Sequence, residues 1–228
     1  MYPPLPAQPP PPGLLAIDTS TDRAGIALAT TGGMISHSWP AARAHTTTVL
    51  PEIDRLVREH GMVPGDITGI VVATGPGTFT GLRVGVALAK GIVAASHVPL
   101  VGIPTLDIVF AQHPGENIVA VLPAGRGRVV WQQAGEVPRN STIVEMVDEL
   151  KARPGTPLVG ELSPDQLDSL QSTGVHVVPE FRDPAVLLYL GAARIAAGDL
   201  DDPVSLEPTY LHGVTVSAPP IEDRLRKA

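Results

Sequence analysis

Cysteine is absent from the 228-residue sequence. The chain therefore forms no disulfide and has no thiol nucleophile or cysteine zinc site, and this composition fits a reducing compartment. Aromatic residues are scarce at 4%, which argues against a surface that stacks on nucleic-acid bases. Basic residues are outnumbered, with 16 Lys and Arg against 23 Asp and Glu and a net charge of −7. Because nonspecific nucleic-acid binding depends on cations that neutralise phosphates, the chain alone is not expected to bind RNA tightly.

Long hydrophobic runs are missing as well. No apolar stretch approaches the roughly 18–20 residues of a membrane-spanning helix, and the N-terminus lacks the basic and apolar regions of a secretory signal. A content of 43% hydrophobic and 17% charged residues is typical of a folded globular protein. We therefore expect a soluble cytoplasmic protein with no membrane partner, folded as one large domain or two small lobes.

Proline dominates the beginning of the chain, with seven prolines in residues 1–13. Proline removes a backbone donor and restricts φ, so this stretch favours extended polyproline II over packed structure. We expect a disordered tail that precedes the fold. A segment that binds a proline-recognising partner is the alternative.

Residues 14–112 have the pattern of a mixed α/β lobe. Short apolar runs bounded by turn signals predict strands at 14–19, 25–30, 33–39, 67–73 and 100–103. Periodic apolar positions predict helices at 46–60, 80–95 and 104–112. The order βββαβαβα predicts an antiparallel meander followed by parallel strands that are reached through crossover helices.

A smaller second lobe is expected over residues 113–213, followed by a C-terminal tail at 214–228. Apolar runs predict strands at 118–122 and 128–133. Three residues are predicted to cap the starts of helices. Thr142 is followed three residues later by Glu145, and Ser163 and Asp183 are each followed directly by proline.

Standard catalytic motifs are missing. The segment Gly75–Leu82 lacks the spacing and the lysine of a P-loop, and it lacks the third glycine of a dinucleotide fingerprint. There is no Gly-x-Ser-x-Gly elbow, and none of the seven histidines pairs with another at helical spacing as a metal site would require. We therefore expect no catalytic residue and no metal ligand.

The end of the first predicted strand is a candidate phosphate-binding segment. There an apolar run ends in Asp18, Thr19 and Ser20 and then turns back. Turn hydroxyls and backbone donors can face a phosphate, and an aspartate can hold a metal-bound water. An ordinary hairpin, in which these side chains satisfy local backbone groups, is the alternative.

The helix expected at 80–95 carries a stripe of small residues. Gly81, Gly85 and Ala89 are spaced four apart and therefore share one helix face. Glycine inside a helix costs about 1 kcal/mol relative to alanine, a cost that close approach of another backbone would explain. The stripe, flanked by Leu88 and Ile92, is interpreted as a surface for a partner helix. Packing against the lobe's own sheet is the alternative.

Five segments together resemble one family, TsaB (YeaZ). They are the strand at 15–21, the helix start Ala44-His45-Thr46 with Leu50-Pro51, the run Gly75-Pro76-Gly77-Thr78-Phe79-Thr80-Gly81-Leu82-Arg83, the segment 99–106 and the segment 207–211. The resemblance is nearly continuous over 14–112, weak over 113–200 and short but clear near 207–211.

The resemblance implies an α/β fold like those of actin, Hsp70 and sugar kinases, with two RNase H-like lobes. It also implies a non-catalytic subunit in the formation of N6-threonylcarbamoyladenosine at position 37 of tRNAs that read ANN codons. Such a subunit would bind and activate a TsaD-like paralogue, work with a TsaE-like ATPase, meet tRNA only through the complex, and form a homodimer when alone. The partner interface carried over from the family comprises His45, Thr80, Gly81, Arg83, Val84, Gly85, Leu88, Ala89 and Ile92.

The second lobe departs from the family at its expected phosphate motif. Relatives often have Asp-Ala-Arg there, whereas this chain has Pro123-Ala124-Gly125, without an acid. The motif at Asp18 is therefore interpreted as degenerate, with no cofactor expected and weak nucleotide binding left open. An actin-fold ATPase or kinase, a glycoprotease-like enzyme and a nucleotide-binding regulator are the alternatives.

Overall fold

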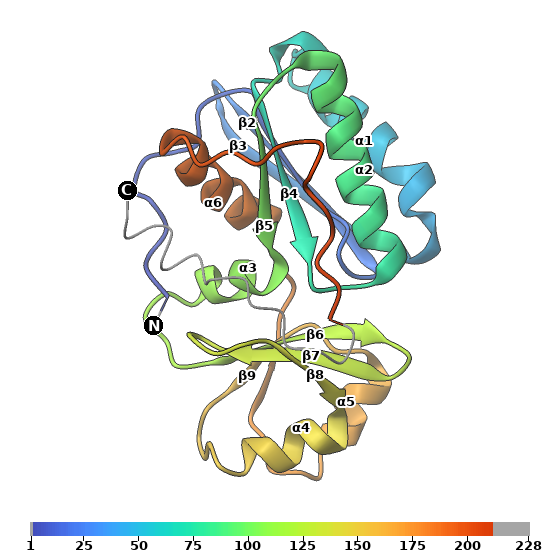
Figure 1. Ribbon diagram of the computed structural model, residues 1–228, viewed down its shortest axis with the longest axis vertical. Coiled ribbons are helices and arrows are strands. Elements are labelled where there is room, and N and C mark those ends of the chain that lie inside the picture. Colours follow the sequence, from blue (N-terminus) through green and yellow to red (C-terminus); the bar gives the residue numbers. More distant parts are fainter. Residues whose placement is uncertain (1, 212–228) are drawn as a thin grey trace.

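Two lobes make up the molecule, joined around helix α3 (Thr105–Gln112) (Figure 1). The computed structural model describes residues 2–211, so the tail expected at 214–228 lies outside the described residues. Each lobe is built on one five-stranded sheet.

The first lobe contains a sheet with the strand order β3-β2-β1-β4-β5. Its strands are β1 (Leu14–Asp18), β2 (Arg23–Thr30), β3 (Gly33–Pro40), β4 (Gly69–Gly75) and β5 (Leu100–Pro104). The first three strands pair antiparallel, whereas β4 pairs in parallel with both β1 and β5. The predicted meander followed by parallel strands is confirmed.

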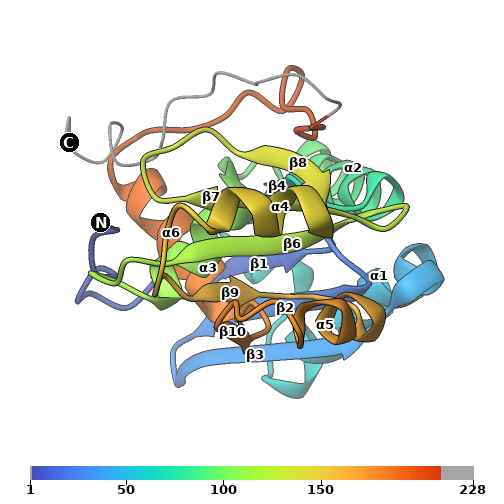
Figure 2. The ribbon, with the colours of Figure 1, turned by 90° about the horizontal axis from the view of Figure 1, so that it is seen from below.

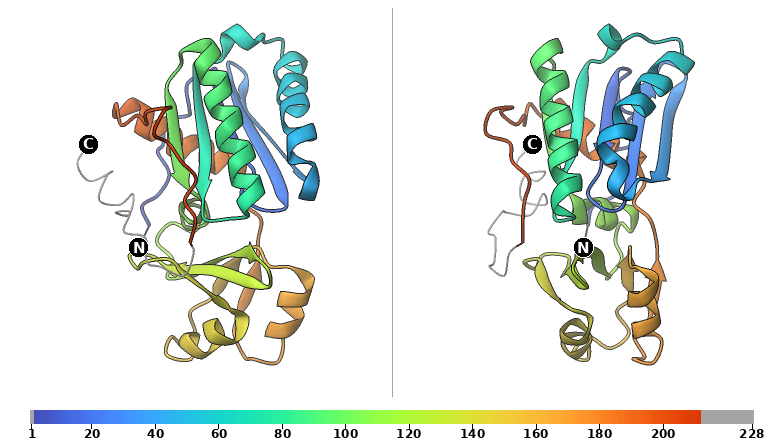
Figure 3. Two further views of the ribbon diagram at one scale, coloured as in Figure 1. Left: turned by 45° about the vertical axis from the view of Figure 1, so that its right-hand side comes forward. Right: turned by 90° about the vertical axis from the view of Figure 1, so that its right-hand side faces the viewer.

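Helices cover both faces of this sheet (Figure 3). α1 (His45–Glu59) and α2 (Phe79–Ser96) lie on one face, and α6 (Pro184–Ala196) lies on the other. The side chains of β1 alternate between two cores: Leu15 and Ile17 join residues of α1 and α2, while Leu14 and Ala16 join residues of α6. Two 3-10 turns, η1 (Ala42–Ala44) and η2 (Pro64–Asp66), precede α1 and β4.

The second lobe repeats this topology. Its elements are β6 (Val119–Gly125), β7 (Arg128–Gln133), β8 (Arg139–Thr142), α4 (Ile143–Leu150), β9 (Leu158–Gly160), α5 (Pro164–Leu170) and β10 (Val177–Pro179). Three strands again form an antiparallel meander, and the last two add in parallel, in the order β10-β9-β6-β7-β8. α4 and α5 cover the face turned away from the first lobe (Figure 2). The last three strands, of three or four residues each, escaped sequence analysis because so short a run shows no alternation.

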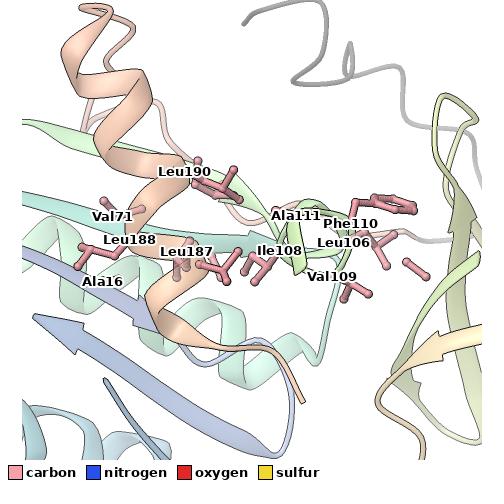
Figure 4. Close-up of a cluster of buried hydrophobic side chains, with 14 of the residues drawn as sticks. Ala16, Val71, Leu106, Ile108, Val109, Phe110, Ala111, Leu187, Leu188 and Leu190 are labelled. Carbon is pink, nitrogen blue, oxygen red and sulfur yellow. The ribbon is translucent and has the colours of Figure 1, made fainter. Parts of the chain in front are cut away.

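The boundary of the second lobe differs from the expected range of 113–213. From Pro184 onward the chain returns to the first lobe, where Leu187 and Leu188 of α6 lie over Ala16 and Val71 (Figure 4). The second lobe therefore ends near residue 183. An apolar helix face can cover either of two apolar sheets, and only the tertiary structure shows which sheet it covers.

The proline-rich segment also differs from the expected disordered tail. Tyr2 is buried and stacks on Phe110 of α3 with 6.0 Å between ring centroids, and Leu5 packs against the same core. At the other end, Gly13 N–H donates to the Ala29 carbonyl. Proline-rich chain can pack as an extended strap because apolar side chains anchor it and few backbone donors need partners.

The predicted helix caps are confirmed in the second half of the chain. The side chains of Thr142 and Ser163 each accept a hydrogen bond from the backbone three residues on, in complete capping boxes, and Asp183 accepts from Ala185 N–H. Each cap therefore fixes where its helix begins.

Contrary to the expectation that no apolar stretch approaches the length of a membrane-spanning helix, α2 is long and apolar enough, by length and composition alone, to cross a membrane, with a mean hydropathy of 1.3. In the structure Val86, Ala89 and Val93 of this helix pack into the core beneath it. α2 therefore has the role of a helix that covers a sheet.

Candidate functional site

Three charged side chains from the two lobes meet at the junction between them. Asp18 ends β1, Glu161 follows β9, and Arg182 lies in the connection from β10 to α6. Arg182 Nε lies 2.8 Å from Asp18 Oδ2, and Arg182 Nη1 lies 2.5 Å from Glu161 Oε1. All three residues are buried, with exposed fractions of 4–8%. We call these three residues the interlobe ion network.

Hydroxyl groups of the β1–β2 turn complete the network. Thr21 Oγ1 donates to Glu161 Oε2 over 2.7 Å and accepts from Arg182 Nη2 over 3.2 Å. The backbone N–H and the hydroxyl of Ser20 both donate to Asp18 Oδ1, over 2.9 and 2.6 Å. Both oxygens of the Asp18 carboxylate are therefore occupied by groups of this chain.

The contacts of the network keep Asp18 and Arg182 charged. Burial alone would raise the pKa of Asp18, but attraction to Arg182 and hydrogen bonds from Arg182 and Ser20 outweigh burial and lower the pKa below its usual value. Burial would likewise lower the pKa of Arg182, but the charges of Asp18 and Glu161 outweigh it and raise the pKa. A charge-assisted contact of this kind is stable only while both partners remain ionised.

The residues at this turn do not fit a nucleotide phosphate. Thr19 Oγ1 donates to the Gly81 carbonyl over 2.7 Å, and Thr78 N–H donates to the Ser20 carbonyl over 2.6 Å. A Cβ added at Gly77 would overlap the Ser20 carbonyl, so the loop at residues 76–78, between β4 and α2, lies directly on the turn. The three candidate phosphate-binding residues thus have partners within the chain: Asp18 binds Arg182, Thr19 binds the first turn of α2, and Ser20 binds Asp18 and Thr78.

The matching position of the second lobe offers no acid. Pro123 and Ala124 lie at the end of β6, before the turn into β7. Across residues 2–211, no three His, Cys, Asp or Glu side chains gather in a way that could hold a metal ion.

The small-residue stripe of α2 faces the lobe itself, which corrects the interpretation as a partner surface. A Cβ on Gly81 would overlap the Thr19 carbonyl, and one on Gly85 would overlap the Thr19 hydroxyl. Ala89 is fully buried in the core between the sheet and the two helices. The backbone that approaches closely is the β1–β2 turn, so the alternative, packing within the lobe, is the correct one.

The opposite side of α2 borders a groove with α1. This space of about 530 Å³ is open to solvent and is lined mainly by apolar atoms. Its lining residues are His45, Thr46, Val49, Leu50, Phe79, Thr80, Arg83, Val84, Ala87 and Leu88. We call it the α1–α2 groove.

The expected interface residues divide between groove and core. Five of them line the groove: His45, Thr80, Arg83, Val84 and Leu88. Ile92 is half-buried and packs against the core, while the three stripe residues are enclosed. His45 is itself buried, and its Nε2–H donates to the Thr21 carbonyl over 2.9 Å, so it orders the helix start beside the turn.

Sequence analysis missed the large apolar side chains of this surface. Leu50 is 53% exposed and Phe79 is 49% exposed. Phe79 lies beneath the Arg83 guanidinium, 3.9 Å from ring centroid to Cζ, and its ring is 5.0 Å from that of Tyr210. Arg83 Nε also donates to the Tyr210 hydroxyl. Leu50, Phe79 and Tyr210 all occur in segments of the family resemblance, which is the sequence signal that could have found them.

Two lobes of one repeated sheet topology, with helices on the outer faces, define the class of actin, Hsp70 and sugar-kinase folds. A family model described as TsaD, tRNA N6-adenosine threonylcarbamoyltransferase, matches residues 26–191. The chain belongs to this family, and the TsaB (YeaZ) assignment within it is confirmed by the relatives that follow.

Similar proteins carry the TsaB and YeaZ names. The chain is 34% identical to the tRNA threonylcarbamoyladenosine biosynthesis protein TsaB of Haemophilus influenzae over 53% of this chain and 52% of that one. It is 30% identical to TsaB of Escherichia coli over 53% of this chain and 54% of that one. The structure of YeaZ from Pseudomonas aeruginosa has a TM-score of 0.70 at 23% identity, over 87% of this chain and 99% of that one. The matched region thus spans about half the length of these curated relatives, whereas the fold matches nearly throughout.

Proposed function

We propose that the chain is a non-catalytic subunit of the complex that forms N6-threonylcarbamoyladenosine at position 37 of tRNAs that read ANN codons. In this proposal it binds and activates a TsaD-like catalytic paralogue. The names of the relatives support the pathway. The observation that carries the role of a binding subunit is the α1–α2 groove with its exposed apolar side chains.

The groove has the chemistry of a protein-binding surface. Leu50 and Phe79 flank it from different helices and are each about half exposed. Large apolar side chains gathered on an open groove mark interaction sites, and a groove between two helices suits the apolar face of another helix. Arg83 adds a cation that is already oriented by two aromatic rings.

The interlobe ion network supports the non-catalytic part of the proposal. Asp18, the acidic residue that an actin-like ATPase or kinase would need, is bound to Arg182. No observation on the described residues favours the alternatives of an ATPase, a glycoprotease-like enzyme or a nucleotide-binding regulator.

The remaining partners follow from the same assignment. A TsaE-like ATPase would join the complex, and tRNA would be bound through the complex because a net charge of −7 disfavours direct binding. Alone, the chain would form a homodimer in which two copies of the groove make a self-complementary contact. The complex would work in the cytoplasm.

The test is a charge placed in the groove. Leu50→Arg should weaken association with the purified TsaD-like paralogue by at least about tenfold, because it buries a charge where an apolar anchor packed. Sedimentation and formation of the modified adenosine in the reconstituted reaction are the measurements. Val144→Arg is the matched control. Val144 is 72% exposed on α4 of the second lobe, whereas the groove lies between two helices of the first lobe.

The two variants should melt at wild-type temperature, because both side chains are exposed. Wild-type association of Leu50→Arg would place the partner surface elsewhere. If both variants lost association to the same degree, the added charge itself, and not its place in the groove, would be responsible.

A further inference from the structure

We infer that the two lobes are held in one closed arrangement by the chain's own contacts, without a nucleotide between them. This goes beyond the proposed function, because it concerns motion between the lobes and not the partner. Two separate ties, from different parts of the chain, carry the inference.

The first tie is the interlobe ion network. Asp18 belongs to the first lobe and Glu161 to the second, and Arg182 contacts each carboxylate through a different nitrogen of one guanidinium. Since the guanidinium is planar and rigid, its two contacts fix the separation and the relative direction of the two carboxylates. If the lobes moved apart, Arg182 could follow only one of them, and a buried carboxylate would lose its partner.

Thr21 strengthens this tie across the junction. It follows β1 in the first lobe, and its hydroxyl donates directly to Glu161 of the second lobe over 2.7 Å. The partners are 140 residues apart in sequence, so this contact depends on the lobes being together. Both side chains are buried, so opening would have to hydrate the whole network at once.

The second tie is the segment 199–211, which follows α6 and runs from the first lobe to the second (Figures 1 and 3). In the first lobe, Asp201 N–H donates to the Leu100 carbonyl and Thr209 N–H donates to the Thr74 carbonyl. In the second lobe, Asn140 Nδ2 of β8 donates to the Leu211 carbonyl over 2.5 Å. Leu211 is buried and belongs to the core that both lobes share.

Together the ties replace what a ligand would otherwise do. Folds of two lobes hinged around a site commonly close when a ligand supplies contacts to both lobes. Here Arg182 supplies those contacts from within the chain. A ligand shifts the equilibrium between open and closed lobes only if it binds one arrangement more tightly than the other. Because the β1–β2 turn is already occupied by groups of the chain, we expect Mg-ATP to bind neither arrangement preferentially.

The absence of cysteine makes a direct measurement practical. Ser96 at the end of α2 and Ser172 after α5 are exposed, one in each lobe, so Ser96→Cys with Ser172→Cys accepts two spin labels. Double electron–electron resonance on the full chain should give one narrow distance distribution, unchanged by millimolar Mg-ATP. Adding Arg182→Met, Thr21→Val and Asn140→Ala, which remove the side-chain contacts of both ties, should broaden the distribution and shift it to longer distances.

The control variant is Arg153→Met. Arg153 is also a largely buried, ion-paired arginine, but its partners Gln133 and Glu136 both lie in the second lobe. Arg153→Met should therefore give the same distance distribution as the wild-type chain. If the doubly cut variant does not fold by circular dichroism, the Mg-ATP comparison on the labelled wild-type chain still decides the inference.

Three results would overturn it: a broad wild-type distribution, a shift when Mg-ATP is added, or a wild-type distribution in the folded variant that lacks both ties. Association with a TsaD-like protein is not part of this measurement, so the proposed function and this inference can fail independently.

Discussion

Arg182 is, at the residue scale, the cation on which two buried carboxylates depend, those of Asp18 and Glu161. Its side chain is 3% exposed, and that of Asp18 is 5% exposed. Buried charges are tolerated when they are paired, and removing one partner is costly because the other stays buried without compensation. Protonation of Asp18 at low pH should therefore weaken the fold.

The prediction at this scale concerns Asp18→Asn and pH. The folded pKa of Asp18 is lowered, so the unfolded chain binds the proton more readily and this carboxylate stabilises the fold above about pH 4. Above that pH the variant should lose about 3 kcal/mol of unfolding free energy, the low end for a broken buried pair, because Glu161 still contacts Arg182.

The difference in unfolding free energy between wild type and Asp18→Asn should decrease as the pH falls below about 4, because the wild-type protein loses this stabilisation when Asp18 takes up a proton. Urea unfolding at a series of pH values measures this gap. A constant gap from neutral pH down to about pH 2.5 would show that the charge of Asp18 is not what stabilises the fold.

At the scale of an element, helix α2 has two functionally different sides: one packs against the β1–β2 turn and the other borders the α1–α2 groove. Its small residues let the β1–β2 turn lie on the helix backbone, and its outer side borders the α1–α2 groove. A substitution on one side should affect stability, and one on the other side should affect association.

Glycine-to-alanine variants separate the two sides. Gly85→Ala should destabilise the protein by about 1–3 kcal/mol, because the new methyl group overlaps the Thr19 hydroxyl and overpacks the turn. Gly91→Ala, where nothing lies within 4 Å of an added Cβ, should stabilise it by up to about 1 kcal/mol, since alanine is the better helix former.

Thermal and urea melts of both variants measure these changes. If Gly85→Ala were as stable as Gly91→Ala, the turn would not lie against the helix as the structure places it. A melt of Gly91→Ala below wild type would instead point to a contact at that position.

The whole molecule consists of two copies of one topology joined by segments that cross between them. The strap at residues 2–13 packs Tyr2 on α3, and the segment 199–211 spans both lobes. These crossings enlarge the core that the lobes share and explain why the chain after residue 183 cannot be assigned to the second lobe.

The prediction for the whole molecule is that the isolated chain hydrolyses no ATP above background in the presence of magnesium. The physical reason is that the Asp18 carboxylate is engaged by Arg182 and Ser20, and the second lobe offers no matching acid. Phosphate release measured on the purified chain is the test, with Asp18→Ala as the control for contaminating enzymes. Hydrolysis that disappears in that variant would favour the ATPase alternative.

Patterns within a few residues were sufficient to predict the first sheet, its helices and the helix caps. Alternation along β1 and the cap at Thr142 depend on neighbours in sequence, so they are visible without tertiary structure. The family resemblance likewise came from contiguous motifs. The spacing of Gly81 and Gly85 also predicted, from the sequence alone, that another backbone approaches this face of the helix closely.

Which backbone approaches was decided only by the tertiary structure, as was the partner of Asp18. Arg182 lies 164 residues from Asp18 in sequence, and no local pattern links them. The same holds for Tyr2 on Phe110 and for α6 on the first sheet, because apolar surfaces and opposite charges are complementary to many partners. The sequence alone predicted the elements of the first lobe, and its contiguous family motifs predicted the class of fold. Long-range packing decided that the glycine stripe faces inward and that the interlobe junction is filled by the chain itself.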